Sequence, residues 1–273
     1  MIYADPIQQQ FASGQFYESS SYPLSPDKLE SDYSPVRFNR ELRIFRKFCA
    51  SGATLDVGCS TGAFLYHLER TFPHAYSGTG MDVAGSALNY AKTRGINVIP
   101  GHFLNQALGS TRFDAITLWA VVEHLAAPRL FLTKAADLLR EGGHCFILVP
   151  NMRSFAVRLL RARYRYIMPE HVNYFTPETL KRFAQTERRF TIQLLESTHF
   201  NPAVIWQDWR SGGMPATEFA RARLLRKTTA LKQSALLAPA KVLYQTCEAF
   251  LNRFLLADNL VVVLKHVAKS AVA

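Results

Sequence analysis

A short turn that follows an apolar run carries the residue types best suited to holding a ligand. The segment Leu55–Gly62 reads LDVGCSTG, with Asp56 near the end of the apolar run and glycines at Gly58 and Gly62. Glycine lacks the Cβ atom that would keep a ligand away from the backbone. A helix that begins after such a turn offers backbone N–H groups to anions. Because the carboxylate of Asp56 adds an acceptor, the pattern predicts a ligand with a cationic or hydroxyl-bearing group.

A second carboxylate follows at the spacing of a nucleotide-binding fold. Asp82 lies about 20 residues after Gly62, at the end of the next expected strand. Its two oxygens match the two hydroxyl groups of a ribose. A dinucleotide dehydrogenase would use the same acid, but its fingerprint is G-x-G-x-x-G, whereas this turn reads Gly58-Cys-Ser-Thr-Gly62. The glycine spacing therefore disfavours NAD.

Alternating strands and helices position these residues. Strands are expected at 54–57, 77–82, 97–100, 113–119, 144–149, 190–198 and 258–265, and helices at 62–71, 84–93 and 128–139. This alternation predicts an α/β fold with a parallel sheet that helices cover on both faces. The segment Glu141–Gly143 is expected to end the third of these helices before the next strand begins.

The residues ahead of the first strand divide into an arm and a helix. Residues 1–34 are rich in Ser, Pro, Asp and Tyr without clear periodicity, which predicts a loosely structured arm with few contacts to the core. Its tyrosines Tyr17, Tyr22 and Tyr33 suit a lid over a ligand pocket, and a plain surface tail is the alternative. Apolar residues at helical spacing from Val36 to Cys49 predict an amphipathic helix that packs on the sheet.

Three motifs in order give the chain a family resemblance. They are LDVGCSTGAF at 55–64, VEHL at 122–125 and LREGGHCFILVPN at 139–151. In this order they resemble the class I S-adenosylmethionine-dependent methyltransferases, and among them the small-molecule branch that contains ubiquinone-biosynthesis and sugar methyltransferases. The resemblance covers about residues 50–200. It implies a Rossmann-like, doubly wound sheet of seven strands whose last strand is antiparallel, with a helical insertion before that strand.

The resemblance also assigns residues to the cofactor. They are Asp56, Gly58, Cys59 and Gly62 in the turn, Asp82 and Val83 after the second strand, Gly101, His102 and Phe103 after the third, and Trp119 at the end of the fourth. Many relatives carry an acid near position 102 for the adenine amine, so His102 is a departure. A tryptophan buried in the core is the alternative interpretation of Trp119.

The candidate catalytic residues lie on a later loop, 169–177, which reads PEHVNYFTP. Thr176 followed by Pro177 predicts a capped helix that anchors this loop to the edge of the sheet. His171, with Glu170 or Tyr174, is expected to orient or deprotonate the methyl acceptor. The alternative is that His171 only tethers the loop through a backbone carbonyl.

Two segments exceed a minimal methyltransferase core. Residues 152–168 contain five arginines and predict a basic helix that leans on the fold by Phe155, Leu159 and Leu160, or an anion site formed by Arg158, Arg161 and Arg165. Residues 214–257 predict a helical insertion, with helices at 217–237 and 239–256, that shapes the acceptor pocket, lies on an acidic membrane or forms a homodimer interface. The expected division is therefore an arm at 1–34, a core at 35–213, this insertion, and the last strand and tail at 258–273.

Composition limits the partners. The chain has 32 Lys and Arg against 21 Asp and Glu, a net charge of +11 that favours an anionic partner such as a phosphorylated metabolite, nucleic acid or an acidic membrane. The four cysteines form no CxxC pair, so neither a zinc site nor a disulfide framework is expected. The first residues do not resemble a signal peptide, and no apolar run reaches the ~18 residues of a membrane span. A cytoplasmic protein is expected, with peripheral contact to the inner face of the membrane as an alternative.

The resemblance implies methyl transfer to a small-molecule, glycan or lipid-linked acceptor, with oxygen as the favoured atom. An RNA methyltransferase would share the basic charge, but its base-modifying signatures are absent after the fourth strand, where the chain reads LWAVVEH. Nucleic acid is therefore not the expected partner. A non-catalytic protein that keeps the cofactor turn as a binding scaffold is the other alternative.

Overall fold

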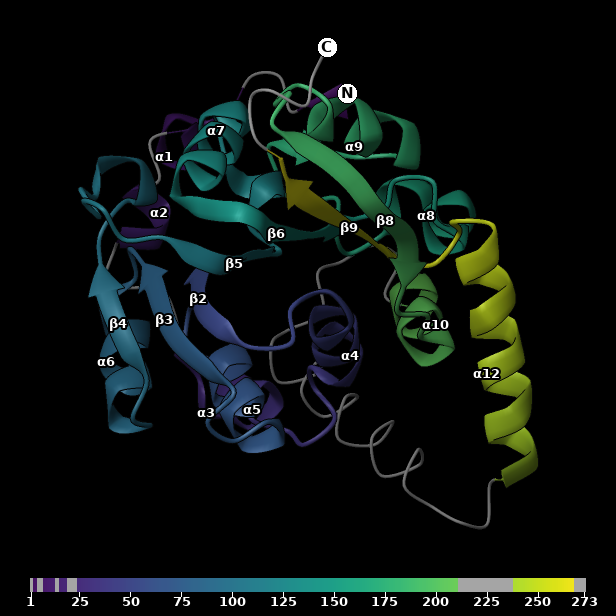
Figure 1. The fold of residues 1–273 in the computed structure, drawn as a ribbon. Helices are drawn as coiled ribbons and strands as arrows, with labels where there is room; N and C mark the ends of the chain where they lie inside the picture. The colour runs from purple at the N-terminus through teal and green to yellow at the C-terminus, as the bar shows by residue number, and fades with distance from the viewer. Residues whose placement is uncertain (1, 4–6, 13–14, 19–23, 211–237, 268–273) are drawn as a thin grey trace.

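A seven-stranded sheet runs through the centre of the computed structural model, which describes residues 2–3, 7–12, 15–18, 24–210 and 238–267 (Figure 1). In spatial order the strands are β4 Asn97–Pro100, β3 Tyr76–Asp82, β2 Gly52–Val57, β5 Phe113–Trp119, β6 Leu139–Pro150, β9 Asn259–His266 and β8 Phe190–Thr198. Only β9 runs antiparallel to its neighbours in this sheet. The predicted fold class, including the antiparallel last strand, is confirmed.

Helices cover both faces of the sheet (Figure 1). The helices around the sheet are α4 Asn39–Phe48, α5 Ala63–Thr71, α6 Gly85–Thr93, α7 Pro128–Leu138 and α9 Pro177–Ala184. Helices α4 and α5 pack on one face in one hydrophobic cluster, and α7 and α9 pack on the other face in a second cluster. The amphipathic helix predicted ahead of the first strand is therefore α4.

Strand β6 shows how the sequence divides the core between the two faces. Phe146 and Leu148 join the cluster of α4 and α5, whereas Cys145, Ile147 and Val149 join the cluster of α7 and α9. Side chains alternate between the faces of a strand, so a strand covered on both faces is apolar at every position. This is why the sequence of β6 lacks the polar alternation of a half-exposed strand.

The start of β6 differs from the prediction. The sequence predicts a helix to 139 and a glycine-containing stop at Glu141–Gly143, but α7 ends at Leu138 and β6 begins at once. Leu139 pairs with Phe113 of β5, and the register shifts before the pairing resumes downstream. Gly142 has a φ of +79° inside this irregular stretch. The glycines therefore form an irregularity within a strand and not a gap before it.

The N-terminal arm is more ordered than the sequence predicts. It contains β1 Ile2–Tyr3, α1 Gln9–Ala12, α2 Gln15–Glu18 and α3 Pro26–Asp32. Strand β1 pairs antiparallel with β7, Asn173–Tyr174. The hydroxyl of Tyr33 donates to the carbonyl oxygen of Thr61 at 2.5 Å, and the hydroxyl of Thr61 donates to Asp32 at 3.1 Å. Aromatic and polar side chains thus attach this segment to the core, although its composition predicts a loose tail. Tyr22 lies outside the described residues.

The arginine-rich segment forms α8, Phe155–Leu160, and the short helix η3, Arg161–Arg163, in place of one long helix. Of the apolar residues expected to hold it against the fold, Leu160 is buried, but Phe155 and Leu159 are exposed. The reason is that α8 ends after six residues, so only one side of a short helix reaches the core.

Two further helices lie beyond β8. Helix α10, Pro202–Arg210, was not predicted, and its Asp208 accepts three hydrogen bonds from Arg165 at 2.6–3.1 Å. Helix α12, Ala238–Arg253, corresponds to the second helix predicted in the insertion and lies beside β8 at the edge of the molecule (Figure 1). The first predicted helix, at 217–237, lies outside the described residues.

Candidate functional site

The turn between β2 and α5 presents its backbone at the carboxyl edge of the sheet. Gly58 and Gly62 have φ angles of +73° and +74°, and Ser60 between them has +49°. Left-handed backbone costs little only at glycine. The N–H group of Gly58 donates to the carbonyl oxygen of Met81 at 2.7 Å, which fixes the turn against β3. Gly58 and Gly62 therefore allow the left-handed backbone that the turn needs at these two positions.

Asp56 lies buried beneath this turn. Its carboxylate accepts a hydrogen bond of 2.6 Å from the hydroxyl of Thr117 on the neighbouring strand β5. Burial raises the pKa of Asp56 to about 7, although the Thr117 hydrogen bond opposes the rise. A buried carboxylate of this kind favours a cationic partner because ionisation then becomes less costly.

Asp82 stands at the carboxyl end of β3 with its carboxylate held on both sides. One oxygen accepts from the backbone N–H of Ser60 at 2.7 Å, and the other accepts from the N–H of Ala84 at 2.9 Å. Each carboxylate oxygen can accept a further hydrogen bond. The geometry leaves Asp82 able to receive the two hydroxyls of a ribose.

The residues predicted to flank adenine follow β4. Gly101 has a φ of +115°, and its N–H donates to the carbonyl oxygen of Asp82 at 2.9 Å. Phe103 begins the short helix η1, Phe103–Asn105, and is buried. His102 is partly exposed and lies 3.6 Å from the carboxylate of Glu18 in the arm. The arm therefore reaches the part of the site where His102 departs from the family pattern.

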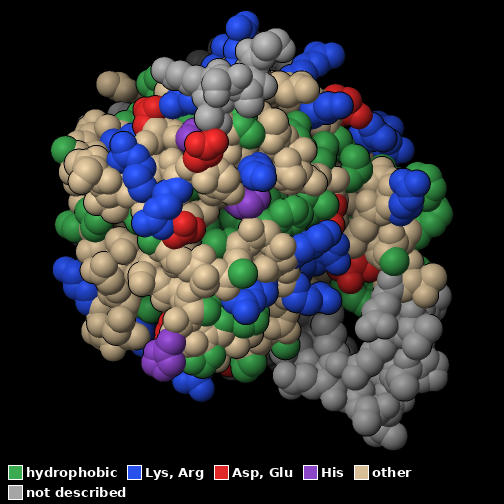
Figure 2. Space-filling view, in the orientation of Figure 1, with side chains coloured by type: hydrophobic (Ala, Val, Ile, Leu, Met, Phe, Trp, Pro, Cys, Tyr) green, Lys and Arg blue, Asp and Glu red, His purple; other side chains and the backbone are tan. Residues whose placement is uncertain are grey.

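A single cavity of about 1430 Å³ joins these residues. Of the predicted site residues, those that line it are Asp56, Gly58, Cys59, Asp82, Val83, Gly101, His102, Phe103, Trp119 and His171. Ligand pockets commonly measure roughly 300–1,000 Å³, so this cavity has room for a cofactor and a second small molecule. Figure 2 shows Lys and Arg side chains gathered near the middle of the face that carries α4, beside exposed hydrophobic side chains.

Three predicted site residues do not line the cavity. A Cβ atom on Gly62 would lie 3.1 Å from Ala91, so Gly62 faces the packing between α5 and α6. Tyr174 donates its hydroxyl to the carbonyl oxygen of Met168 at 3.0 Å, within its own loop. Glu170 contributes its backbone carbonyl to the site, as an acceptor for His124. We therefore assign Glu170 and Tyr174 no contact with substrate.

The cavity fits an S-adenosyl cofactor by the polar atoms that it leaves without partners. Within the part of the chain that the structure describes, the hydroxyl of Ser60 and the indole N–H of Trp119 are buried and make no hydrogen bond. Both residues line the cavity, as do the carboxylates of Asp56 and Asp82. Buried polar groups are rarely left unpaired in a protein, so a polar ligand is expected here. Acceptors for an amino group and a ribose thus lie beside donors for a carboxylate.

Trp119 combines the two interpretations given for it. Its ring packs against Phe64 at 5.4 Å and Phe146 at 6.1 Å between ring centroids, as a core residue does. It also lines the cavity.

Cys59 likewise both lines the cavity and packs in the interior. A Cβ atom on Gly80 would lie 2.6 Å from the sulfur of Cys59, so the two residues are in close contact. Burial raises the pKa of this thiol, which keeps it neutral.

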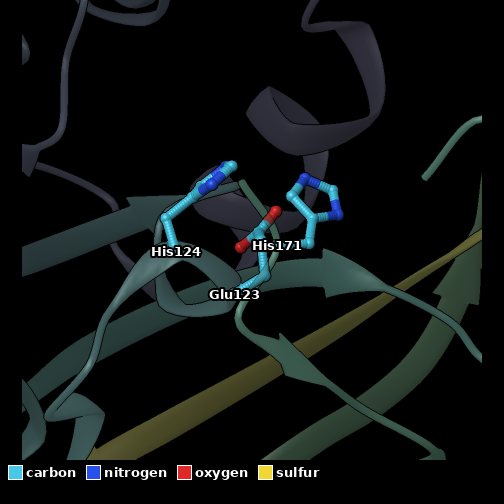
Figure 3. Close-up of side chains that lie close together, drawn as sticks. All are labelled: Glu123, His124 and His171. Carbon is cyan, nitrogen blue, oxygen red and sulfur yellow. The ribbon is translucent and has the colours of Figure 1, made fainter. Parts of the chain in front are cut away.

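Three side chains that line the cavity lie close together: Glu123, His124 and His171 (Figure 3). Their ligand atoms all lie within 4.8 Å of one another, which is the spacing of a metal-binding group. The short helix η2, Val122–His124, follows β5 and supplies the first two. The N–H of Val172 donates to the carbonyl oxygen of Glu123 at 2.8 Å, and this bond brings His171 to the pair.

Hydrogen bonds to carbonyl oxygens fix the tautomers of both histidines. Nδ1 of His171 lies 2.8 Å from the carbonyl oxygen of Tyr166, and Nδ1 of His124 lies 2.9 Å from that of Glu170. A carbonyl oxygen can only accept, so each Nδ1 carries the proton and each Nε2 keeps a lone pair. The tether predicted as the alternative role of His171 is therefore present. Tyr17 of the arm also contacts Nδ1 of His124, at 2.8 Å.

Burial shifts the pKa values of Glu123 and His171 in opposite directions. Burial, with a contribution from His124, lowers the pKa of His171 to about 3. Burial raises the pKa of Glu123 to about 8, and its Oε2 atom makes no hydrogen bond within the described residues. A proton acceptor works best when its pKa lies near the working pH. The pKa of Glu123 therefore lies closer to neutral pH than that of His171.

Comparison with known proteins places the domain in a family. The family described as a methyltransferase domain matches residues 37–187, more than half of the chain. The chain belongs to this family. Its resemblance to class I S-adenosylmethionine-dependent methyltransferases, predicted from the three motifs, is thereby confirmed. The matched range includes the turn, both carboxylates and the Glu123–His171 cluster.

Relatives with assigned names match part of the domain. A ubiquinone biosynthesis O-methyltransferase of Dinoroseobacter shibae is 32% identical over 118 residues, which cover 40% of this chain and 46% of that protein. Another, from Methylobacterium sp., is 31% identical over 150 residues, 50% of this chain and 59% of that protein. The chain thus spans about half the length of the curated relatives it matches.

Solved structures share the fold of the domain over most of its length. The plantazolicin methyltransferase BamL, in complex with a triazolic desmethylPZN analog and SAH, has a TM-score of 0.60 at 15% identity and covers 95% of this chain and 96% of its own. The [4+2]-cyclase SpnF has a TM-score of 0.55 at 14% identity, over 84% of this chain and 81% of its own. A cyclase among these neighbours means that the fold alone does not decide the reaction.

Proposed function

We propose that this domain binds S-adenosylmethionine at the carboxyl edge of β2 and β3 and transfers its methyl group to an oxygen of a small acceptor. The bound cofactor would supply an electrophilic methyl group. Asp56 and the backbone of the turn would hold its amino acid part, and Asp82 would hold its ribose. The observation that carries the proposal is the shared cavity, in which these residues and the Glu123–His171 cluster face one volume.

The cluster supports oxygen as the acceptor atom. A hydroxyl group keeps its proton at neutral pH, so methyl transfer to its oxygen needs a proton acceptor nearby. Glu123 would take that proton, while His171 would orient the hydroxyl through Nε2. The printed names of the relatives, O-methyltransferases of ubiquinone biosynthesis, agree with an oxygen acceptor. A glycan or a lipid-linked intermediate would also offer a hydroxyl group as the methyl acceptor.

Transfer of labelled methyl into fractionated cell extract tests the proposal and identifies the acceptor. Tritiated S-adenosylmethionine is incubated with extract and each protein variant, and label in the separated products is counted. Glu123→Gln is expected to lower transfer by roughly 10²- to 10⁴-fold, the range for loss of a general base. His171→Gln should lower it less, and Glu178→Gln, which changes an exposed carboxylate of α9, should not lower it.

Three results separate the alternatives. Equal binding of S-adenosylhomocysteine by all variants would show that the losses arise in the transfer step. Full transfer by Glu123→Gln would place the proton acceptor elsewhere. Binding of S-adenosylmethionine without transfer to any fraction would favour the non-catalytic scaffold.

We also propose that the domain works in a reducing cytoplasm and contacts an acidic membrane surface peripherally. All four cysteines are free thiols, and none of the described helices has the length and apolarity needed to cross a bilayer. Exposed aromatic residues lie on α8, on α10, and on α12 or directly after it: Phe155, Trp206, Trp209, Phe250 and Phe254. The guanidinium of Arg210 lies 5.1 Å from the centroid of the Trp206 ring. Aromatic rings with basic side chains suit a lipid interface.

Sedimentation with acidic liposomes at low salt tests this surface. The wild-type protein is expected to sediment with them, and replacement of both Trp206 and Trp209 by Ser should weaken the association. Absence of co-sedimentation at every salt concentration would contradict the membrane contact.

A further inference from the structure

A buried carboxylate that the proposed transfer step does not use also lines the cavity. Glu41 lies in the first turn of α4, is 3% exposed and lines the cavity. One of its oxygens, Oε1, lies 2.5 Å from Nε2 of His199. Its other oxygen, Oε2, is buried and has no hydrogen-bond partner in the described ranges. A buried carboxylate oxygen without a partner is costly unless a ligand supplies the missing donor.

The fold holds His199 in place for this contact. His199 directly follows β8 and has a φ of +62°, a left-handed conformation that is unusual for a residue with a side chain. Its carbonyl oxygen accepts from the N–H of Asp258, at 2.8 Å, just before β9. Backbone strain at a cavity wall is retained only where the surroundings enforce it. Here it turns the imidazole toward α4.

The free Glu41 oxygen can only accept a hydrogen bond while the carboxyl is ionised, so the groups around it matter. Burial would raise the pKa of Glu41, but His199 and Arg37 outweigh it and hold this pKa below its usual value. Asp258 also lines the cavity, and burial raises its pKa to about 7. Arg165, one of the three arginines predicted as an anion site, is already paired with Asp208. Glu41 and Asp258 thus present carboxylates to a cavity that Arg37, Arg40 and Arg43 also line.

The position of Glu41 separates it from the transfer step. β8 lies three strands away from β5, which carries Trp119 at its end. Neighbouring strands are about 4.8 Å apart, so the end of β8, which His199 follows, lies roughly 14 Å from the end of β5 across the sheet. Glu41 is therefore a residue for recognition of the distal part of the acceptor, and Glu123 remains the proton acceptor.

The geometry points to a distal acceptor subsite in which Glu41, oriented by His199, receives an N–H or O–H donor from an amino or hydroxyl group of the methyl acceptor. This inference rests on the proposed function. It restricts the acceptor to molecules that carry such a polar group away from the methylated oxygen. An acceptor whose distal part is a bare hydrocarbon chain would leave Glu41 without its partner.

The test compares Glu41→Gln with wild-type protein in the extract assay, as a function of extract concentration. Glutamine keeps the volume and can still accept from His199, but its NH₂ group would face the donor of the ligand. We expect the extract concentration for half-maximal transfer to rise at least tenfold, with the maximal rate and the affinity for S-adenosylhomocysteine unchanged. Glu196→Gln is the matched control, because Glu196 pairs with Arg40 of α4 at 2.9 Å but does not line the cavity.

A second readout is independent of methyl transfer. Protein saturated with S-adenosylhomocysteine is dialysed against the same extract, and bound solutes are identified by mass spectrometry. Wild-type protein should retain an amine- or hydroxyl-bearing solute that Glu41→Gln does not retain. Acetylation of the extract with acetic anhydride should abolish retention if the group is an amine, and periodate should abolish it if the group is a vicinal diol.

The outcomes distinguish this inference from the proposed function. Unchanged half-saturation in Glu41→Gln, or retention of the same solute by both proteins, would overturn the subsite. Failure of the wild-type protein to retain any solute would also overturn it. Retention by the wild-type protein without methyl transfer would instead contradict the proposed function and leave the subsite supported.

Discussion

Asp56 couples the binding of a cationic ligand to pH. Burial raises its pKa to about 7, so below neutral pH the unliganded protein holds a proton on this carboxyl. An acid whose folded-state pKa is raised favours folding at low pH, and this contribution is lost as pH rises from about 4 through 7. A ligand ammonium group reverses the preference because it needs the ionised carboxylate.

This coupling predicts the pH dependence of cofactor affinity. The amino group of S-adenosylhomocysteine stays protonated below about pH 8, so between pH 7 and 5 its binding must displace the proton of Asp56. The dissociation constant measured by calorimetry should therefore rise about tenfold for each pH unit below 7. Asp56→Asn should bind weakly with little pH dependence. A steep wild-type profile that persists in Asp56→Asn would assign the proton to another group.

At the level of single residues, the sequence predicted positions along one motif better than contacts between motifs. Asp56, Gly58 and Asp82 could be predicted because a strand followed by a glycine turn fixes their place locally. The pairing of Glu41 with His199 spans 158 positions and depends on where the loop after β8 meets α4. No spacing rule reports such a contact. The raised pKa of Glu123 was likewise hidden, because burial, and not residue type, causes it.

The turn between β2 and α5 is the element on which the cofactor site depends. Gly58 has a φ of +73°, and a Cβ atom there would lie 2.5 Å from Cγ2 of Val121. Gly85, at the start of α6, has open space around the position of a Cβ atom. The two glycines therefore offer a matched pair of substitutions.

Gly58→Ala is expected to lower both stability and cofactor affinity. Left-handed backbone costs an alanine about 1–2 kcal/mol, and the contact with Val121 adds to that cost. Thermal unfolding should show a lower melting temperature, and affinity for S-adenosylhomocysteine should fall at least tenfold. Gly85→Ala should leave both unchanged or stabilise the helix by about 0.4–1 kcal/mol. Equal effects of the two substitutions would argue against a role for the turn.

At the level of elements, strong apolar periodicity predicted the strands and main helices, whereas weakly patterned segments were predicted less well. The arm at 1–34 has no periodicity because its order comes from contacts such as that of Tyr33 with Thr61. Helix α10 was missed because distant residues hold it: Ile205 packs with Leu160 and Tyr164 in one cluster, and Asp208 pairs with Arg165. In both cases long-range contacts, which the local sequence does not encode, decide the structure.

Across the whole molecule, the order of the strands brings separate motifs to one cavity. The carboxyl ends of β2, β3 and β5 lie at one edge of the sheet, and the antiparallel β9 begins at that same edge beside the end of β8. Ligands bind at such an edge in open α/β sheets. The topology therefore brings Asp56, Asp82 and His199 to one edge of the sheet, where they line one cavity together with Glu41.

Calorimetric titration of the protein with S-adenosylmethionine tests the cofactor site most directly. One molecule should bind per chain, and Asp82→Ala should weaken binding at least tenfold, because hydrogen bonds to a charged group contribute about 1.5–3 kcal/mol each. Absence of binding by the wild-type protein, or equal binding by Asp82→Ala, would contradict a cofactor site at the edge of β2 and β3.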